Sequence, residues 1–203
     1  VISVKAALVL LAGLALTGLG VLLSFNHFTI WLGLGSLIPI AIYPFMKRIT
    51  SWPQAMLGLA FAWGGLVGWS ALTGTLDVAP CLVYVAAVFW TIGYDTIYAI
   101  QDFDDDSIAG IRSTPRLFGA ATKKMVTLFY VLTLLCLSAA YQMVHTGPMA
   151  WLGLLAFCGH LGWQIHHIDL KNPQMALTLF RSNRDAGIIL ALSLSLDPLS
   201  RLI

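Results

Sequence analysis

Residues 94–114 read YDTIYAIQDFDDDSIAGIRST, and this stretch sets the character of the chain because it gathers acidic side chains between apolar runs. Five of the nine acidic residues lie between Asp95 and Asp106. On an α-helix, Asp95, Asp102 and Asp106 are seven and four positions apart, so the spacing predicts one narrow stripe, with Tyr98 beside it. Carboxylates on one face repel each other, whereas Mg²⁺ takes carboxylate oxygens and is commonly shared with phosphate. The pair Asp102 and Asp106 therefore predicts half of a metal–diphosphate site. A solvated acidic loop is the alternative, which Asp95 disfavours because it continues the stripe into an apolar helix.

The composition indicates a membrane protein. The chain is 59% hydrophobic and 10% charged, whereas soluble domains carry about 25% charged residues. Apolar runs near the length needed to cross a bilayer occur about seven times, at 4–24, 28–46, 54–74, 79–101, 125–145, 148–166 and 185–199. We therefore expect an all-α, polytopic transmembrane helix bundle of about seven helices, forming one domain over residues 1–203. No nucleic-acid partner is expected.

The basic residues predict which way the bundle faces. Three longer or more charged connections, 47–53, 102–124 and 167–184, hold nine of the eleven Lys and Arg side chains. The turns on the opposite side carry neither Lys nor Arg, apart from Arg201 at the extreme C-terminus. By the positive-inside rule the three charged connections are cytoplasmic. The acidic stretch is therefore expected to open at that face.

Two groups of polar residues in these connections could bind an anion. Lys47 and Arg48 sit at the end of an apolar run, either as a positive-inside anchor or as ligands of a phosphate or carboxylate, which the fork of Arg suits. Arg112, Ser113 and Thr114 could contact phosphate or belong to an ordinary cytoplasmic loop.

The third charged connection is less informative. His166, His167 and Asp169 invite a metal interpretation, but adjacent histidines on a helix point about 100° apart, so interfacial polar residues are the better interpretation. Ser182 and Asn183 precede the last apolar run, and their first interpretation is a helix N-cap. A transporter with a cytoplasmic acidic site is the alternative from another functional class, although the acidic residues lie at one face rather than at mid-membrane and no internal repeat is evident.

Three segments resemble the UbiA superfamily of intramembrane prenyltransferases. Residues 94–114 resemble its second aspartate-rich motif, and YPFMKRITSWPQ (43–54) and FRSNR (180–184) resemble two further segments. The likeness runs over about residues 5–195. The family's first motif, Asn-Asp-x-x-Asp-x-x-x-Asp, occurs nowhere in the sequence. The resemblance therefore implies the C-terminal seven of nine helices, with the chain incomplete at its N-terminus.

The resemblance also implies an activity. It implies Mg²⁺-dependent transfer of a polyprenyl group from its diphosphate to the ring of 4-hydroxybenzoate in ubiquinone biosynthesis, or to another acceptor such as homogentisate or a chlorin. It implies an integral protein of the bacterial or mitochondrial inner membrane, with its site facing the cytoplasm or matrix and this segment inactive alone. The expected catalytic residues are Asp102, Asp106 and Arg48, and the expected metal ligands are Asp102 and Asp106. The expected substrate-binding residues are Lys47, Arg48, Asp95, Tyr98, Arg112, Ser113, Thr114 and Asn183.

Overall fold

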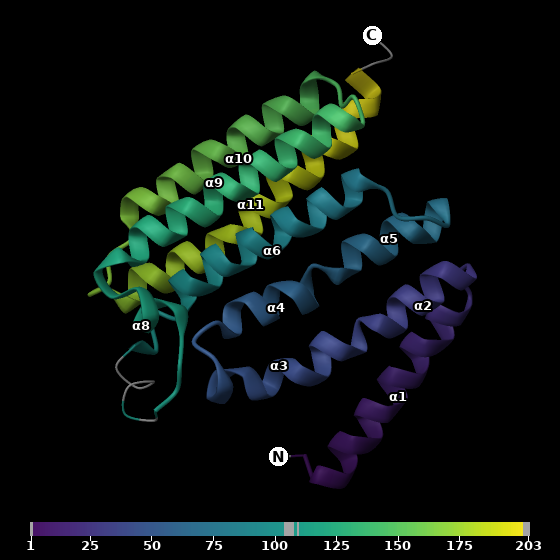
Figure 1. Ribbon diagram of the computed structural model, residues 1–203, viewed down its shortest axis with the longest axis horizontal. Coiled ribbons are helices and arrows are strands. Elements are labelled where there is room, and N and C mark those ends of the chain that lie inside the picture. The colour runs from purple at the N-terminus through teal and green to yellow at the C-terminus, as the bar shows by residue number, and fades with distance from the viewer. Residues whose placement is uncertain (1, 104–107, 109, 201–203) are drawn as a thin grey trace.

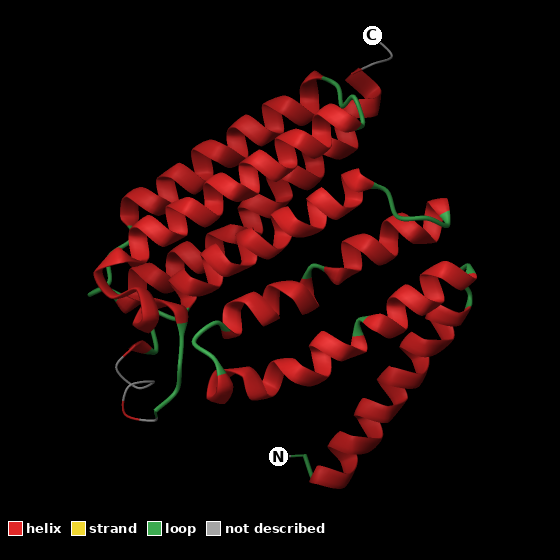
Figure 2. Cartoon of the chain, viewed as in Figure 1, coloured by secondary structure: helices red, strands yellow, loops and turns green. Residues whose placement is uncertain are grey.

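A computed structural model describes residues 2–103, 108 and 110–200, which form helices joined by short loops, without a strand among them (Figures 1 and 2). The first half of the chain contains α1 (Val4–Leu23), α2 (His27–Gly35), α3 (Leu37–Ile49), α4 (Pro53–Phe61), α5 (Trp63–Thr73) and α6 (Val78–Tyr98). The second half contains α8 (Thr114–Phe118), the 3₁₀ turn η1 (Gly119–Ala121), α9 (Thr122–Met143), α10 (Pro148–His167) and α11 (Pro173–Ser200). The predicted all-α bundle is confirmed.

Two of the predicted runs are helical rods with a break near the middle. The rod of α2 and α3 breaks at Ser36, because Pro39 has no N–H for the carbonyl of Gly35 and its ring crowds that turn. The rod of α4 and α5 breaks at Ala62, just before Gly64 and Gly65, whose helix propensity is low. Among the described residues, five segments are long and apolar enough to cross a membrane: Val4–Leu23, His27–Ile49, Pro53–Thr73, Val78–Tyr98 and Thr114–Met143.

The start of the last helix differs from the prediction. We expected Ser182 and Asn183 to cap a run beginning near residue 185, but α11 begins at Pro173 and both residues lie inside it. Asn172 provides the cap: its side-chain Oδ1 accepts a hydrogen bond from the Met175 backbone N–H at 3.0 Å. The third charged connection is therefore short, from the end of α10 at His167 to Pro173.

The core lies where α6, α9, α10 and α11 meet. α6 packs along α9, and α10 packs along α11 (Figure 1). The α6–α9 contact requires Gly93, because a Cβ there would overlap the ring of Tyr130. By contrast, α1 contributes no buried residue to the bundle.

The three charged connections meet at one end of the bundle, at the left of Figure 1. The backbone N–H of Arg112 donates to the Lys47 carbonyl at 3.2 Å, and its guanidinium donates to the Ile49 carbonyl at 2.9 Å. The Lys123 ammonium donates to the His166 carbonyl at 3.1 Å. The prediction that these connections share one side is therefore confirmed.

The opposite end is closed by a buried carboxylate. Asp197 of α11 is 4% exposed and accepts hydrogen bonds from the backbone N–H of Gly147 at 2.7 Å and of Ala150 at 3.1 Å. These two N–H groups lie at the start of α10, where a glycine N-cap has no side chain to offer. One helix thus caps another at the end remote from the charged connections.

Candidate active site

A small polar pocket lies at the charged end of the bundle, between α3, α4 and the end of α6. Its volume is about 60 Å³, and it is lined by Tyr43, Lys47, Pro53, Gln54, Asp95, Tyr98, Ala99, Asp102 and Ser113. Five of the predicted site residues are among them: Lys47, Asp95, Tyr98, Asp102 and Ser113. The structure thus brings carboxylates, an ammonium and hydroxyls from distant parts of the sequence to one place.

The predicted acidic stripe is helical only over its first part. α6 ends at Tyr98, and the next residues form turns in which Ile100 and Gln101 donate to the carbonyls of Ile97 and Tyr98. The prediction of one continuous helix through Asp102 is therefore wrong, since i→i+3 hydrogen bonds tighten the chain after Tyr98. Asp95 and Asp102 nevertheless line the same pocket. Asp106 lies outside the described residues, as do residues 104, 105, 107 and 109.

The two adjacent cations of α3 are placed differently. Both residues are exposed, but Lys47 lines the polar pocket one turn after Tyr43, whereas Arg48 is not among the lining residues. Successive residues of a helix point about 100° apart, so only one of the two can face the pocket. The role of Arg48 in anion binding stays a prediction.

Hydrogen bonds fix the segment that follows the acidic stretch. The Thr114 backbone N–H donates to the side-chain Oε1 of Gln54 at 3.3 Å, and the hydroxyls of Thr114 and Thr96 are 2.6 Å apart. Thr114 is fully buried by these contacts and does not line the pocket. Ser113, 3% exposed, has a hydroxyl without a hydrogen-bond partner among the described residues. Ser113 also lines an open groove with Arg112 and Arg116.

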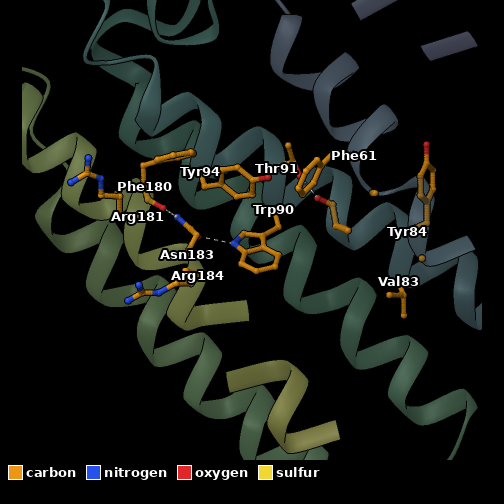
Figure 3. A pocket seen from close by; sticks show the side chains of 13 residues that line it. Phe61, Val83, Tyr84, Trp90, Thr91, Tyr94, Phe180, Arg181, Asn183 and Arg184 are labelled. Atoms are coloured by element: carbon orange, nitrogen blue, oxygen red, sulfur yellow. Dashed lines mark hydrogen bonds between the residues drawn. The ribbon is translucent and has the colours of Figure 1, made fainter. Parts of the chain in front are cut away.

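A larger apolar pocket lies between α4, α5, α6 and α11. Its volume is about 570 Å³, and it is lined by Phe61, Ala62, Gly65, Val83, Tyr84, Ala87, Trp90, Thr91, Tyr94, Phe180, Arg181, Asn183 and Arg184 (Figure 3). Phe180 separates it from the polar pocket: its ring centroid is 5.9 Å from that of Tyr94 and 4.6 Å from that of Tyr98. Aromatic side chains therefore form the boundary between a polar site and an apolar one.

Asn183 is held in the wall of the apolar pocket. Its side-chain Oδ1 accepts from the Trp90 indole N–H at 2.9 Å, and its Nδ2 donates to the carbonyls of Leu179 and Phe180, both at 3.1 Å (Figure 3). With these bonds made, Asn183 ties α11 to α6. Its predicted contact with substrate stays a prediction.

The carboxylates of the polar pocket suit a hard cation. No group of three or more His, Cys, Asp or Glu that could hold a metal occurs within residues 2–103, 108 and 110–200. Asp102 has no hydrogen bond or ion pair with another described residue, so its oxygens are available as ligands. Carboxylate oxygens are the donors that Mg²⁺ prefers.

Sequence reasoning did not single out several residues that the structure brings to the two pockets. Tyr43 precedes Lys47 by four residues, a spacing that puts both on one helical face and could have identified Tyr43. Gln54 follows Pro53 at the start of α4. Tyr94 and Phe180 begin two of the segments that resemble the family, whereas Trp90 carried no distinguishing signal, because aromatic residues are common in apolar helices.

Comparison with known proteins identifies relatives along almost the whole chain. The sequence profile described as the UbiA prenyltransferase family matches residues 1–186. The 4-hydroxybenzoate polyprenyltransferases of mitochondria from Bos taurus and Homo sapiens are each 43% identical, over 203 and 201 residues. The match covers 98% of this chain and 54% of each relative, so the chain spans about half their length. The 4-hydroxybenzoate octaprenyltransferase of Pseudomonas syringae pv. tomato is 38% identical over 97% of this chain and 66% of its own length.

Solved structures show the same fold. A UbiA homolog from Aeropyrum pernix K1 in its apo form superimposes with a TM-score of 0.82 at 20% identity, over 97% of this chain and 74% of that one. A digeranylgeranylglyceryl phosphate synthase superimposes with a TM-score of 0.69 at 17% identity, over 97% and 70%. The five apolar segments and these relatives identify an integral membrane protein. The match over residues 1–186 and the shared fold show that the chain belongs to the UbiA prenyltransferase family.

Proposed function

We propose that the chain forms the prenyl-transferring part of a 4-hydroxybenzoate polyprenyltransferase. The names of the mitochondrial and bacterial relatives support 4-hydroxybenzoate as the acceptor and a polyprenyl group as the group transferred, for which we propose the diphosphate as donor. Because those relatives include mitochondrial and bacterial enzymes, we place the protein in an inner membrane, with the polar pocket facing the cytoplasm or matrix. The outer faces of the helices would then contact membrane lipid.

The observation that carries this proposal is the pairing of the two pockets. A polar pocket with carboxylates and an ammonium suits a metal–diphosphate group, and an apolar pocket of about 570 Å³ suits a prenyl chain. Tyr94, Phe180 and Tyr98 stand between them, where the carbon bound to the diphosphate would lie. A prenyl diphosphate has the same two parts in the same order.

The reaction breaks the bond between the prenyl carbon and the diphosphate oxygen, and the diphosphate leaves with the electron pair. The ring carbon ortho to the phenol hydroxyl forms the new carbon–carbon bond and then loses its proton to the released diphosphate. Lys47 and the free Ser113 hydroxyl would bind the departing oxygens, which stabilises charge as it develops. The apolar pocket excludes water, which would otherwise react with the allylic cation. Asp95 and Tyr98 would position the ring hydroxyl.

We propose that Asp102, together with Asp106, holds Mg²⁺. When bound, the cation supplies positive charge that offsets the charge of the departing diphosphate. Asp102 fits this role because it lines the polar pocket and its oxygens have no partner among the described residues.

The test is a product assay with the full-length protein, in membranes of a host that lacks its own 4-hydroxybenzoate polyprenyltransferase. We expect prenylated 4-hydroxybenzoate to form from polyprenyl diphosphate, and its formation to stop when EDTA is added and resume with Mg²⁺. Homogentisate is offered in parallel as the competing acceptor. Turnover of homogentisate without turnover of 4-hydroxybenzoate would reject the proposed acceptor, and turnover of neither would reject the function.

A further inference from the structure

The side chain of Gln54 is an amide in the wall of the polar pocket. It follows Pro53 at the start of α4 and is only 2% exposed. A buried amide needs partners for both its carbonyl oxygen and its NH₂ group. The partners that these two ends have in the protein therefore indicate what the side chain can still bind.

The oxygen end of this amide already has a partner. The Thr114 backbone N–H donates to Gln54 Oε1 at 3.3 Å, and because a backbone N–H can only donate, this bond fixes which end of the amide is the oxygen. Gln54 Nε2 has no acceptor among the described residues, and it is not one of their buried, unpartnered polar atoms. It is therefore accessible from the pocket, and its N–H groups remain for a ligand there.

Two further donors of the pocket belong to other elements and are held in place relative to Gln54. Lys47 belongs to α3, and Ser113 precedes α8. The Arg112 backbone N–H donates to the Lys47 carbonyl at 3.2 Å, and its guanidinium donates to the Ile49 carbonyl at 2.9 Å. With the bond to Gln54 Oε1, these contacts join the α3–α4 corner to the segment before α8. The three donors are thus positioned relative to one another before a ligand binds.

We infer that Gln54 is a substrate-binding residue, whose Nε2 donates to an oxygen of the diphosphate beside Lys47 and Ser113. This inference rests on the proposed function. Both hydrogens of Nε2 are donors, so the group that they meet must be an acceptor. Three donors and the proposed metal-binding Asp102 lie in one pocket, and a diphosphate has enough oxygens for all of them, whereas a single carboxylate has two.

The test measures binding as well as turnover in the full-length protein. Gln54→Glu keeps an acceptor for the Thr114 N–H, but it loses the donor and adds a charge that repels diphosphate. Gln54→Met removes both ends of the amide and adds no charge. We expect either change to raise KM for polyprenyl diphosphate at least about tenfold, the scale of a lost hydrogen bond to a charged group. KM for 4-hydroxybenzoate should stay close to that of the unsubstituted protein.

Binding is read without turnover, from the rise in the thermal unfolding midpoint when inorganic diphosphate and Mg²⁺ are added to the purified protein. The unsubstituted protein should show this rise, and both Gln54 variants should show a smaller one. The matched control is Gln174→Glu. Gln174 also follows a proline at the start of a helix at the charged end, but it is exposed and lines neither pocket of the candidate site. This control should retain both the KM and the rise.

Three outcomes would overturn the inference. The first is an unchanged rise and an unchanged KM in both Gln54 variants, and the second is an equal loss in the Gln174 control. The third is an increase in KM for 4-hydroxybenzoate alone, which would assign Gln54 to the acceptor. A protein that binds magnesium diphosphate and forms no product would instead overturn the proposed function, and the binding comparison would still test Gln54.

Discussion

At the scale of single residues, side chains that look equivalent in the sequence differ in whether they line the polar pocket. Asp102 lines it, and its oxygens have no partner among the described residues, whereas Asp169 lies exposed in the α10–α11 loop, where it accepts from the Lys171 backbone N–H at 2.9 Å. The two carboxylates share one end of the bundle and differ in access to the pocket. Comparing substitutions at these two residues therefore measures how much a carboxylate in the pocket contributes to catalysis.

We predict that Asp102→Asn lowers kcat at least about 10²-fold, the scale for losing one preorganised group that stabilises developing charge. Asp106→Asn should do the same, as the sequence spacing predicts. Asp169→Asn is the control and should leave kcat close to that of the unsubstituted protein. Initial rates at saturating Mg²⁺ and both substrates measure this. Equal rates for Asp102→Asn and Asp169→Asn would remove Asp102 from the reaction.

The adjacent cations give a second comparison. Lys47 lines the pocket and Arg48 does not, so Lys47→Gln should lower kcat/KM for the polyprenyl diphosphate at least about tenfold more than Arg48→Gln, because a charge-assisted hydrogen bond is lost. Arg48→Lys keeps the positive charge but removes the planar guanidinium, so it tests whether the fork geometry of Arg48 matters. A larger loss for Arg48→Gln than for Lys47→Gln would restore Arg48 as the anion-binding residue that the sequence predicts.

At the scale of helices, close packing of α6 on α9 depends on Gly93. We predict that Gly93→Ala lowers the midpoint of thermal unfolding in detergent, because the added Cβ overlaps the Tyr130 ring and forces one helix to shift. Gly159→Ala in α10 is the control, since a Cβ there meets no atom within 4 Å and alanine favours helix. The unfolding midpoint of Gly159→Ala should equal or exceed that of the unsubstituted protein. A Gly93→Ala midpoint no lower than the control would show that the contact is loose.

The sequence predicts the helices well where apolar runs are unbroken and poorly where charges interrupt them. Six of the seven predicted runs coincide with a helix or a broken rod to within a few residues at most ends. The seventh began too late, because Arg181, Arg184 and Asp185 made residues before 185 look like a loop. The true start carried its own signal in Asn172 followed by Pro173, an N-cap and a proline at the first helical position.

The site was only partly predictable for a related reason. Spacing identified Asp95 and Asp102 as neighbours, and they are, although a turn rather than a continuous helix joins them. Which of Lys47 and Arg48 faces the pocket depends on the rotation of α3 against α4 and α6. The aromatic boundary depends on α11 packing against α6, two helices about 90 residues apart in sequence, as in the Trp90–Asn183 hydrogen bond. Local patterns contain neither relationship.

At the scale of the molecule, the charge asymmetry predicts the orientation in the bilayer. We predict that, in a variant without Cys81, Cys136 and Cys158, a cysteine replacing Lys171 reacts with an impermeant maleimide only from the cytoplasmic side. A cysteine replacing Thr75, in the α5–α6 turn, should react only from the other side. Right-side-out and inverted vesicles give the two readings. The reverse labelling pattern at both positions would show that the bundle has the opposite orientation, with the polar pocket on the outer side.

The carboxylate of Asp197 ties the beginning of α10 to the end of α11, and Gly147 and its acceptor are 50 positions apart in the sequence. During synthesis, the ribosome therefore completes α10 before the group that caps it has been made. Until residue 197 emerges, the N–H groups of Gly147 and Ala150 must find water or other partners at the membrane surface. The capping contact between Asp197 and the start of α10 thus forms only after nearly all of this sequence has been translated. The two helices α10 and α11 therefore reach their final packing together.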